Sequence, residues 1–175
     1  MYLVSAYFDS ETNKILQGYI NKIAAATGNG FMVENNVPPH LTLSAIEARS
    51  VDVLLPAFES LAGEISQGEI SIITVGQLMP KVIYVAPYLN EYLCALEQRI
   101  FDCLSGIPET TVSNYYKPLS WLPHITLAKT LTREQMLEAV RVMEDFKSIK
   151  AKVEKIGLAK VNPHQDVSQI QLSIP

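Results

Sequence analysis

Two histidines share a short pattern, because each is followed at the second position by a threonine. The segments read PHLTL from position 39 and PHITL from position 123. Alternate residues of a β-strand point to the same face, so His40 would share a face with Thr42, and His124 with Thr126. Threonine makes up only 9 of the 175 residues, and the chain has three histidines. A doubled His-x-Thr is therefore on the order of a 1% coincidence.

These residue types suit displacement at phosphorus. One group must take a proton from the attacking oxygen and another must give one to the leaving oxygen, and a histidine pair can hold one neutral base and one protonated acid. Threonine hydroxyls can donate hydrogen bonds to the free phosphate oxygens. We therefore expect His40 and His124 to be catalytic and Thr42 and Thr126 to bind phosphate, without a metal or cofactor. The pattern leaves open which histidine is the acid, since the roles exchange with the direction of reaction.

The alternatives for these residues are structural. A single His-x-Thr usually carries no function, and a duplicated strand without catalysis remains the competing interpretation of the pair. The third histidine, His164, lies in the segment NPHQD, which is typical of an exposed turn. No two histidines have the short spacing of metal ligands on one helix or turn, so we expect no metal site.

Further candidates surround the two motifs. Tyr115, Lys117 and Trp121 lie in the long loop before the second motif, where aromatic rings could stack on a base and the lysine could meet a phosphate. The structural alternative is that the aromatic residues cap the core. Tyr7 and Tyr84 occupy similar places in two expected strands and could line a ligand site, although strand tyrosines are more often packing residues.

The apolar periodicity predicts alternating strands and helices. The strands are expected at Leu3–Phe8, His40–Ile46, Glu69–Leu78, Val82–Ala86, His124–Thr130, Lys152–Leu158 and Val167–Ser173. The helices are expected at Ser10–Thr27, Val53–Ala62, Leu89–Leu104 and Arg133–Phe146. Gly28 should end the first helix, and Thr132 with Gln135 should form a capping box at the start of the last one.

The order of these elements repeats. Leu3 corresponds to Val82 at an offset of 79 residues, and His40 to His124 at an offset of 84. We therefore expect an α+β fold made of two β-α-β-α-β units, in which two antiparallel sheets face a central cleft with the helices outside. The whole chain, 1–175, would form one domain with pseudo-symmetric lobes of about 1–80 and 81–175.

Composition narrows the class of ligand. The chain is 48% hydrophobic and carries 14 Lys and Arg against 18 Asp and Glu, a net charge of −4, with no run of basic residues. Binding to long duplexes by counterion release requires clustered cations. We therefore expect a short or small phosphate ligand, such as a small nucleotide or an RNA end, and no long duplex nucleic acid. A monomeric protein is also expected.

Localisation and redox state follow from simpler features. The first residues lack the basic start of a signal peptide, and no segment reaches the roughly 20 apolar residues of a membrane span, so a cytoplasmic protein is the expectation. Cys94 and Cys103 fall nine residues apart on one expected helix. That spacing places them roughly 13 Å apart, which is too far for a disulfide.

The two motifs also resemble those of the 2H phosphoesterase superfamily, which includes the bacterial 2'-5' RNA ligase and cyclic phosphodiesterase group. Its mark is a His-x-Thr/Ser-hydrophobic motif in each half of a bilobal fold, here HLTL and HITL, the second preceded by Trp121. The resemblance spans nearly the whole chain. Many bacterial relatives carry Arg where this chain has Lys129, and Lys cannot make a bidentate contact to phosphate.

The resemblance implies that both histidines flank the scissile phosphate and both threonines bind its free oxygens. It implies hydrolysis of a 2',3'-cyclic phosphate, or cleavage and re-formation of a 2'-5' linkage, and it makes Lys129 a substrate-binding candidate. The alternative is a nucleotide-binding or RNA-end-binding module of the same fold that lacks catalysis. Two proton carriers favour the enzyme, since binding alone requires only hydroxyls and cations.

Overall fold

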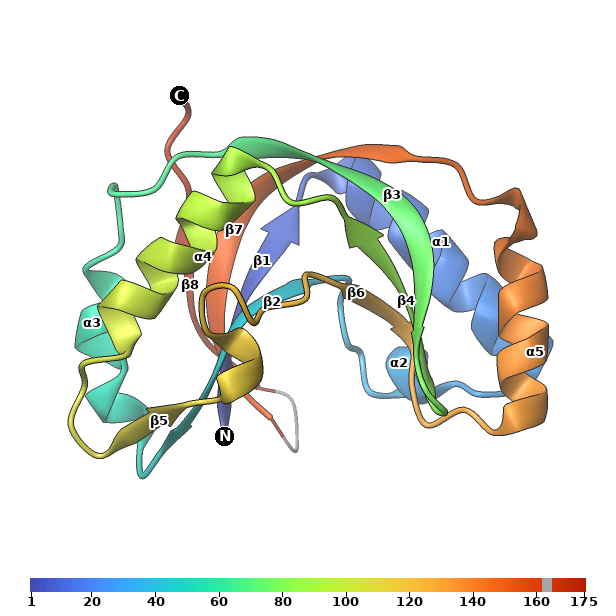
Figure 1. Cartoon of the computed structure of the whole chain (residues 1–175), viewed down its shortest axis with the longest axis horizontal. Coiled ribbons are helices and arrows are strands. Elements are labelled where there is room, and N and C mark those ends of the chain that lie inside the picture. Colours follow the sequence, from blue (N-terminus) through green and yellow to red (C-terminus); the bar gives the residue numbers. More distant parts are fainter. Residues whose placement is uncertain (162–164) are drawn as a thin grey trace.

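A computed structural model describes residues 1–161 and 165–175 (Figure 1). The strands are β1 (Tyr2–Phe8), β2 (Leu41–Ala48), β3 (Gly68–Leu78), β4 (Val82–Pro87), β5 (Thr110–Val112), β6 (Ile125–Ala128), β7 (Ile149–Lys160) and β8 (Gln165–Gln171). The α-helices are α1 (Ser10–Thr27), α2 (Phe31–Glu34), α3 (Leu55–Glu59), α4 (Glu91–Leu104) and α5 (Arg133–Val142). The expected turn at His164 lies outside the described residues.

The strands of the described residues form one antiparallel sheet. Its order is β5-β2-β1-β7-β3-β4-β6, and β8 also pairs with β7. Pairing of β3 with β7, from Gly68↔Val153 to Ile72↔Ile149, joins what the sequence suggested would be two separate sheets. The sheet bends into an arch (Figure 1). As a result, parts of β2 and β6 approach within 8 Å between Cα atoms, although they stand near opposite ends of the strand order.

The two repeats exchange elements. β1 pairs with β2 and with β7 from the second repeat, while β4 pairs with β6 and with β3 from the first repeat. Helix α1 packs against α5 and β6, whereas α4 packs against β2 and β3. Figure 1 shows α3 and α4 at one end of the arch and α1, α2 and α5 at the other. The mixed α/β fold class predicted from the sequence is confirmed, and elements of the two sequence repeats interleave in the sheet.

The aliphatic residues of both motifs belong to the core. Leu41 and Leu43 of β2 and Ile125 and Leu127 of β6 are fully buried. Because strand side chains alternate, this burial turns the histidine and threonine of each motif to the opposite face of the sheet. Burying each aliphatic side chain contributes about 1.5–3 kcal/mol, so the orientation of the motifs is strongly specified.

The helix ends follow the predicted signals. Asp9 caps α1 by accepting hydrogen bonds from the backbone N–H of Thr12 and of Lys152, both at 2.9 Å. Partial burial raises the pKa of Asp9, but these bonds outweigh it and lower the pKa below its usual value. Gly28 ends α1 with a φ of 68°, and the capping box begins at Thr132 as expected.

Several short elements were missed in the sequence. α2 and β5 lie in segments expected to be loops, and a 3₁₀ turn at Asn114–Tyr116 follows β5. The predicted helix 133–146 instead ends at Val142 and continues as a 3₁₀ turn, and the predicted helix 53–62 shortens to α3. Elements of three to five residues carry no periodic signal and depend on tertiary contacts.

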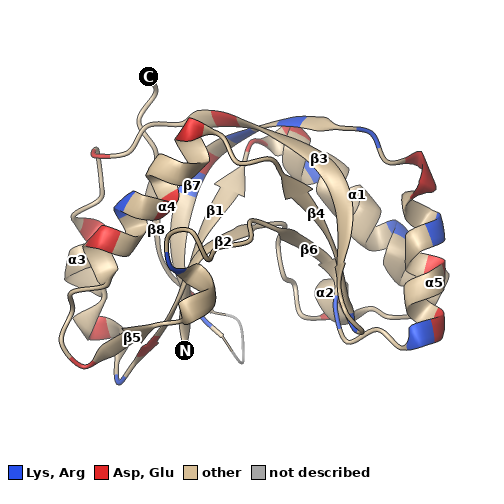
Figure 2. Ribbon diagram, in the orientation of Figure 1, with Lys and Arg blue, Asp and Glu red and all other residues tan. Residues whose placement is uncertain are grey.

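Two further expectations concern cysteines and membrane spans. Both cysteines are free, as expected, and the Cys103 thiol donates to the Ala57 carbonyl at 3.0 Å. No helix among the described residues has both the length and the apolar character that a bilayer span requires. Lys and Arg are distributed over both ends of the arch (Figure 2).

Candidate active site

Both histidines are held in the same way. The His40 Nδ1 lies 2.7 Å from the Pro38 carbonyl oxygen, and the His124 Nδ1 lies 2.9 Å from the Leu122 carbonyl oxygen. A carbonyl oxygen only accepts, so Nδ1 must carry the proton in each ring. Nε2 is then the nitrogen at which either ring can take up or release a proton during chemistry. The proline between the carbonyl and the histidine limits the backbone at both places.

The two threonines occupy equivalent positions in the sheet but differ in exposure. Thr42 is opposite Ser5 on β1, and Thr126 is opposite Tyr84 on β4. Thr42 is buried and Thr126 is half-buried. The small Ser5 and the large Tyr84 therefore stand at corresponding places, which makes the surroundings of the two motifs chemically different.

Trp121 connects the two motifs directly. Its indole Nε1–H donates to the Thr42 carbonyl at 3.0 Å, across 79 residues of sequence. β5 covers β2 only from Ile46 to Ala48, so this bond occupies the edge of β2 beyond the end of that pairing. The segment that precedes His124 is thereby hydrogen-bonded to the first motif. Of the three loop candidates predicted from the sequence, Trp121 is the one that the structure brings to a motif.

The neighbouring tyrosines of the same loop have different surroundings. Tyr115 has 80% of its surface exposed, and Lys117 is exposed as well. Tyr116 instead packs against the core, and its hydroxyl interacts with the Thr42 side chain. Burial raises the pKa of Tyr116, opposed by that contact with Thr42, so the phenol keeps its proton at neutral pH. The sequence offers both adjacent tyrosines of this loop and does not distinguish Tyr116 from Tyr115, because a 3₁₀ turn decides which of the two rings turns inward.

Tyr7 and Tyr84 each lie beside a histidine. Their ring centroids are 6.4 Å from His40 and 5.3 Å from His124, respectively. Each ring passes over a glycine of the adjacent strand, Gly157 for Tyr7 and Gly76 for Tyr84, where an added Cβ would overlap it. Burial, with a smaller contribution from a nearby carboxylate, raises the pKa of Tyr7 to about 12.

The pairing register of the strands bears on the prediction that Tyr7 and Tyr84 occupy similar places. Because Tyr84 corresponds to Ser5, the counterpart of Tyr7 is Ala86, two residues further along β4. The two tyrosines therefore reach similar surroundings from positions that the duplication does not relate. Of the corresponding residues Tyr7 and Ala86, only the one in the first repeat carries a phenol.

Lys129 lies away from the face that carries His124 and Thr126. Its Nζ is 4.4 Å from the centroid of the Phe31 ring on α2, a cation–π contact. It follows Ala128 at the end of β6, and strand alternation directs it to the side of the helices. In the described part of the chain, no three His, Cys, Asp or Glu side chains are grouped in a way that could bind a metal ion.

The sequence matches the profile of the 2'-5' RNA ligase superfamily over residues 16–165. The match covers most of the chain, so the protein belongs to this superfamily of 2H phosphoesterases. Comparison with curated protein sequences gives no match.

Solved structures share the fold at low sequence identity. TT0787 of Thermus thermophilus superposes with a TM-score of 0.64 at 17% identity, covering 99% of this chain and 98% of that one. E. coli LigT complexed with 3'-AMP gives a TM-score of 0.61 at 17% identity, with 98% and 97% covered. Kluyveromyces marxianus Usb1 gives 0.50 at 11% identity, with the same coverage as LigT. These neighbours confirm the expected fold class.

Proposed function

We propose that this chain is a phosphodiesterase that uses His40 and His124 as general acid and base. It would hydrolyse nucleotide 2',3'-cyclic phosphates, or cleave and join 2'-5' RNA linkages. The observation that carries the proposal is the matched orientation of the two imidazoles, each with Nδ1 held by the carbonyl oxygen two residues earlier. Membership of the 2'-5' RNA ligase superfamily supports the same class of reaction.

The reaction would proceed by proton transfer at the two Nε2 atoms. One neutral imidazole takes a proton from the attacking water in hydrolysis, or from the attacking hydroxyl in cleavage and joining, and the other, protonated, donates to the departing oxygen. Thr42 and Thr126 donate hydrogen bonds to the free phosphate oxygens as charge builds on them. The scheme requires no metal. The titles of the LigT structures, complexed with 3'-AMP, ATP and NADP+, support a nucleotide as the ligand.

The experiment compares wild-type protein with the His40→Ala, His124→Ala double variant in EDTA. Substrates are 2',3'-cyclic nucleotides and 2'-5'-linked dinucleotides. We expect turnover by the wild type only, and a loss of about 10²–10⁴-fold for each single histidine variant. A Thr126→Val variant, which keeps the side-chain volume, should lower kcat by about 10–100-fold.

A folding control and a defined contrary outcome make the result interpretable. Urea denaturation of each variant separates loss of chemistry from loss of folding. Tight nucleotide binding by a wild type that turns over none of these substrates would reject the enzyme and support the binding module instead.

A further inference from the structure

Two adjoining cavities lie along helix α1, and none of the described residues that line them belongs to a motif. Their volumes are about 480 Å³ and about 410 Å³. Because both are lined by Glu11, Ile15 and Tyr19, they form one continuous depression, which we call the α1–β7 groove. It is lined by one face of α1 and by the segment that opens β7: Glu11, Lys14, Ile15, Gly18, Tyr19, Lys22 and residues 147–150.

The floor of this groove is apolar and open. Ile15 has 38% of its surface exposed, and Tyr19 is half-buried with its ring packed on Phe146 at 5.8 Å between centroids. Gly18 lies between them in the middle of α1, where glycine destabilises a helix relative to alanine. A Cβ atom at Gly18 would meet no atom of the described residues within 4 Å, apart from the nearby backbone of α1 itself. Packing of the described chain therefore does not require this glycine, and a bound group can approach the helix closely there.

The rim of the groove is positively charged, although the whole chain has a net charge of −4. Four exposed lysines stand there against the single carboxylate of Glu11, which leaves +4 − 1 = +3. Lys22 has an exposed ion pair to Asp145 at 3.5 Å, and within residues 1–161 and 165–175 no ion pair involves Lys14, Lys147 or Lys150.

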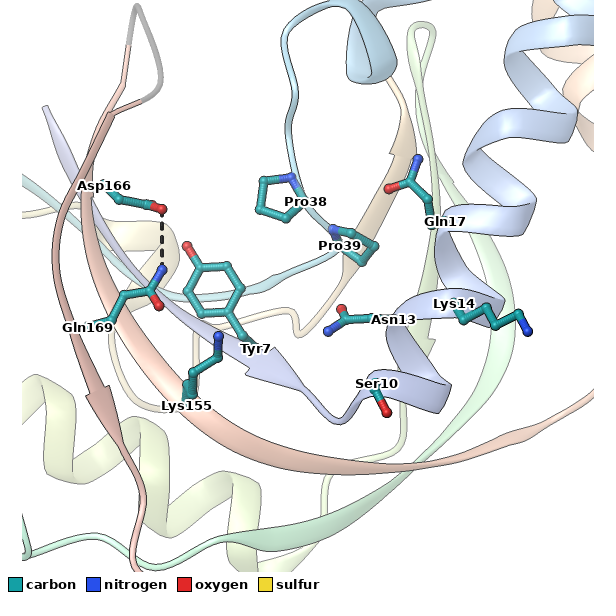
Figure 3. Close-up of a pocket in the computed structure, with 10 residues that line it drawn as sticks. All are labelled: Tyr7, Ser10, Asn13, Lys14, Gln17, Pro38, Pro39, Lys155, Asp166 and Gln169. Atoms are coloured by element: carbon teal, nitrogen blue, oxygen red, sulfur yellow. Dashed lines mark hydrogen bonds between the residues drawn. The ribbon is translucent and has the colours of Figure 1, made fainter.

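Lys14 also borders a separate pocket beside the first motif. Figure 3 shows its side chain directed away from Tyr7 and Asn13 of that pocket. Its ammonium group is therefore available to the rim of the α1–β7 groove.

The combination of an apolar floor with a cationic rim favours a protein ligand over a nucleic acid. Single-stranded RNA is usually held by aromatic faces on which bases stack. The Tyr19 ring already has Phe146 packed on it and the Lys22 Nζ 5.3 Å from its centroid. Glu11, in the wall that both cavities share, would also repel a phosphate backbone.

We propose that the α1–β7 groove binds an acidic amphipathic segment of a partner protein. Apolar side chains of that segment lie on the floor around Gly18, and its carboxylates meet the rim lysines. This is the mode in which an amphipathic helix occupies an apolar groove, with charge complementarity setting its orientation. The interaction goes beyond the proposed catalytic function and does not depend on it.

The test measures binding of a fluorescein-labelled peptide, built from the repeat Glu-Glu-Leu-Leu-Glu-Glu-Leu, to the full chain by fluorescence anisotropy. Gly18→Leu fills the floor, and we expect it to weaken binding at least about tenfold. The urea midpoint should not fall, because leucine is a better helix former than glycine. The matched control is Ala25→Leu, which adds the same side chain at an exposed position of α1 outside both cavities and should leave the affinity unaltered.

A second variant tests the rim without changing the floor. The Lys14→Gln, Lys147→Gln double variant should weaken peptide binding about tenfold and make the remaining affinity less sensitive to salt. Lack of peptide binding by the wild type, or equal affinities of Gly18→Leu and Ala25→Leu, would overturn the proposal. Tighter binding of a single-stranded oligouridylate than of the peptide, lost in Gly18→Leu, would overturn it as well and assign the groove to RNA.

Discussion

Replacing Trp121 with phenylalanine tests whether a hydrogen bond from the segment before the second motif positions the first motif. The change deletes the indole N–H that donates to the Thr42 carbonyl at 3.0 Å and keeps an aromatic ring in place. β5 does not extend beyond Ile46 along β2, so no other described strand takes over that carbonyl on this edge. The variant therefore removes one identifiable tertiary bond and little else.

The expected magnitude comes from two contributions. Loss of the hydrogen bond costs about 1 kcal/mol, and the carbonyl left without its partner brings the cost towards the upper part of a range of about 1–3 kcal/mol. Trp121 is half-buried, so the smaller ring loses only part of an aromatic side chain's burial, about 0.5–1 kcal/mol. We expect the free energy of unfolding to fall by about 3 kcal/mol, with an unaltered m-value.

Urea denaturation measures that fall, and kcat/KM on a 2'-5' dinucleotide measures its effect on the site. We expect kcat/KM to drop at least about tenfold, since Thr42 is held less firmly. Tyr115→Phe is the matched control, because that ring is 80% exposed and its change should stay within about 0.5 kcal/mol. If Trp121→Phe behaves like the control in both measurements, the bond does not position the first motif.

Three further changes probe the same framework. Tyr116→Phe should reduce kcat/KM about fivefold more than Tyr115→Phe, because only the first loses a hydroxyl that contacts a motif threonine; equal effects in parallel assays would argue against that contact. Asp9→Asn should lower the free energy of unfolding by about 1 kcal/mol at pH 7. The pKa of Asp9 is lowered on folding, so this stabilisation is complete above the unfolded value of about 3.9 and is lost as pH falls through the folded pKa. The difference in free energy of unfolding between the wild type and Asp9→Asn, measured by urea denaturation, should therefore disappear below about pH 4. A difference that does not change with pH would contradict this account of the Asp9 cap. Gly76→Ala should cost about 1–3 kcal/mol, because the new methyl group overlaps the Tyr84 ring; an unaltered urea midpoint would mean that the ring moves aside freely.

Local signals in the chain determined most of the elements and the motif residues. α1 was predicted with the bounds Ser10–Thr27 that the structure has, because an apolar stripe and Gly28 mark it within one stretch of sequence. The doubled motif likewise followed from the sequence, and the burial of Leu41 and Ile125 agrees with the strand alternation on which that motif was interpreted. These features depend on neighbours only a few residues apart, which a linear sequence displays.

Tertiary structure alone decided how the halves combine and which further residues reach the motifs. The pairing of β3 with β7 into one bent sheet depends on contacts between distant segments, and so does the choice of Tyr116 over Tyr115. The pairing of Lys155 with Tyr7 also could not be recognised in the sequence, because the two residues meet only across adjacent strands of the sheet. Such relations are set by packing over long sequence separations, for which a single chain offers no periodic signal.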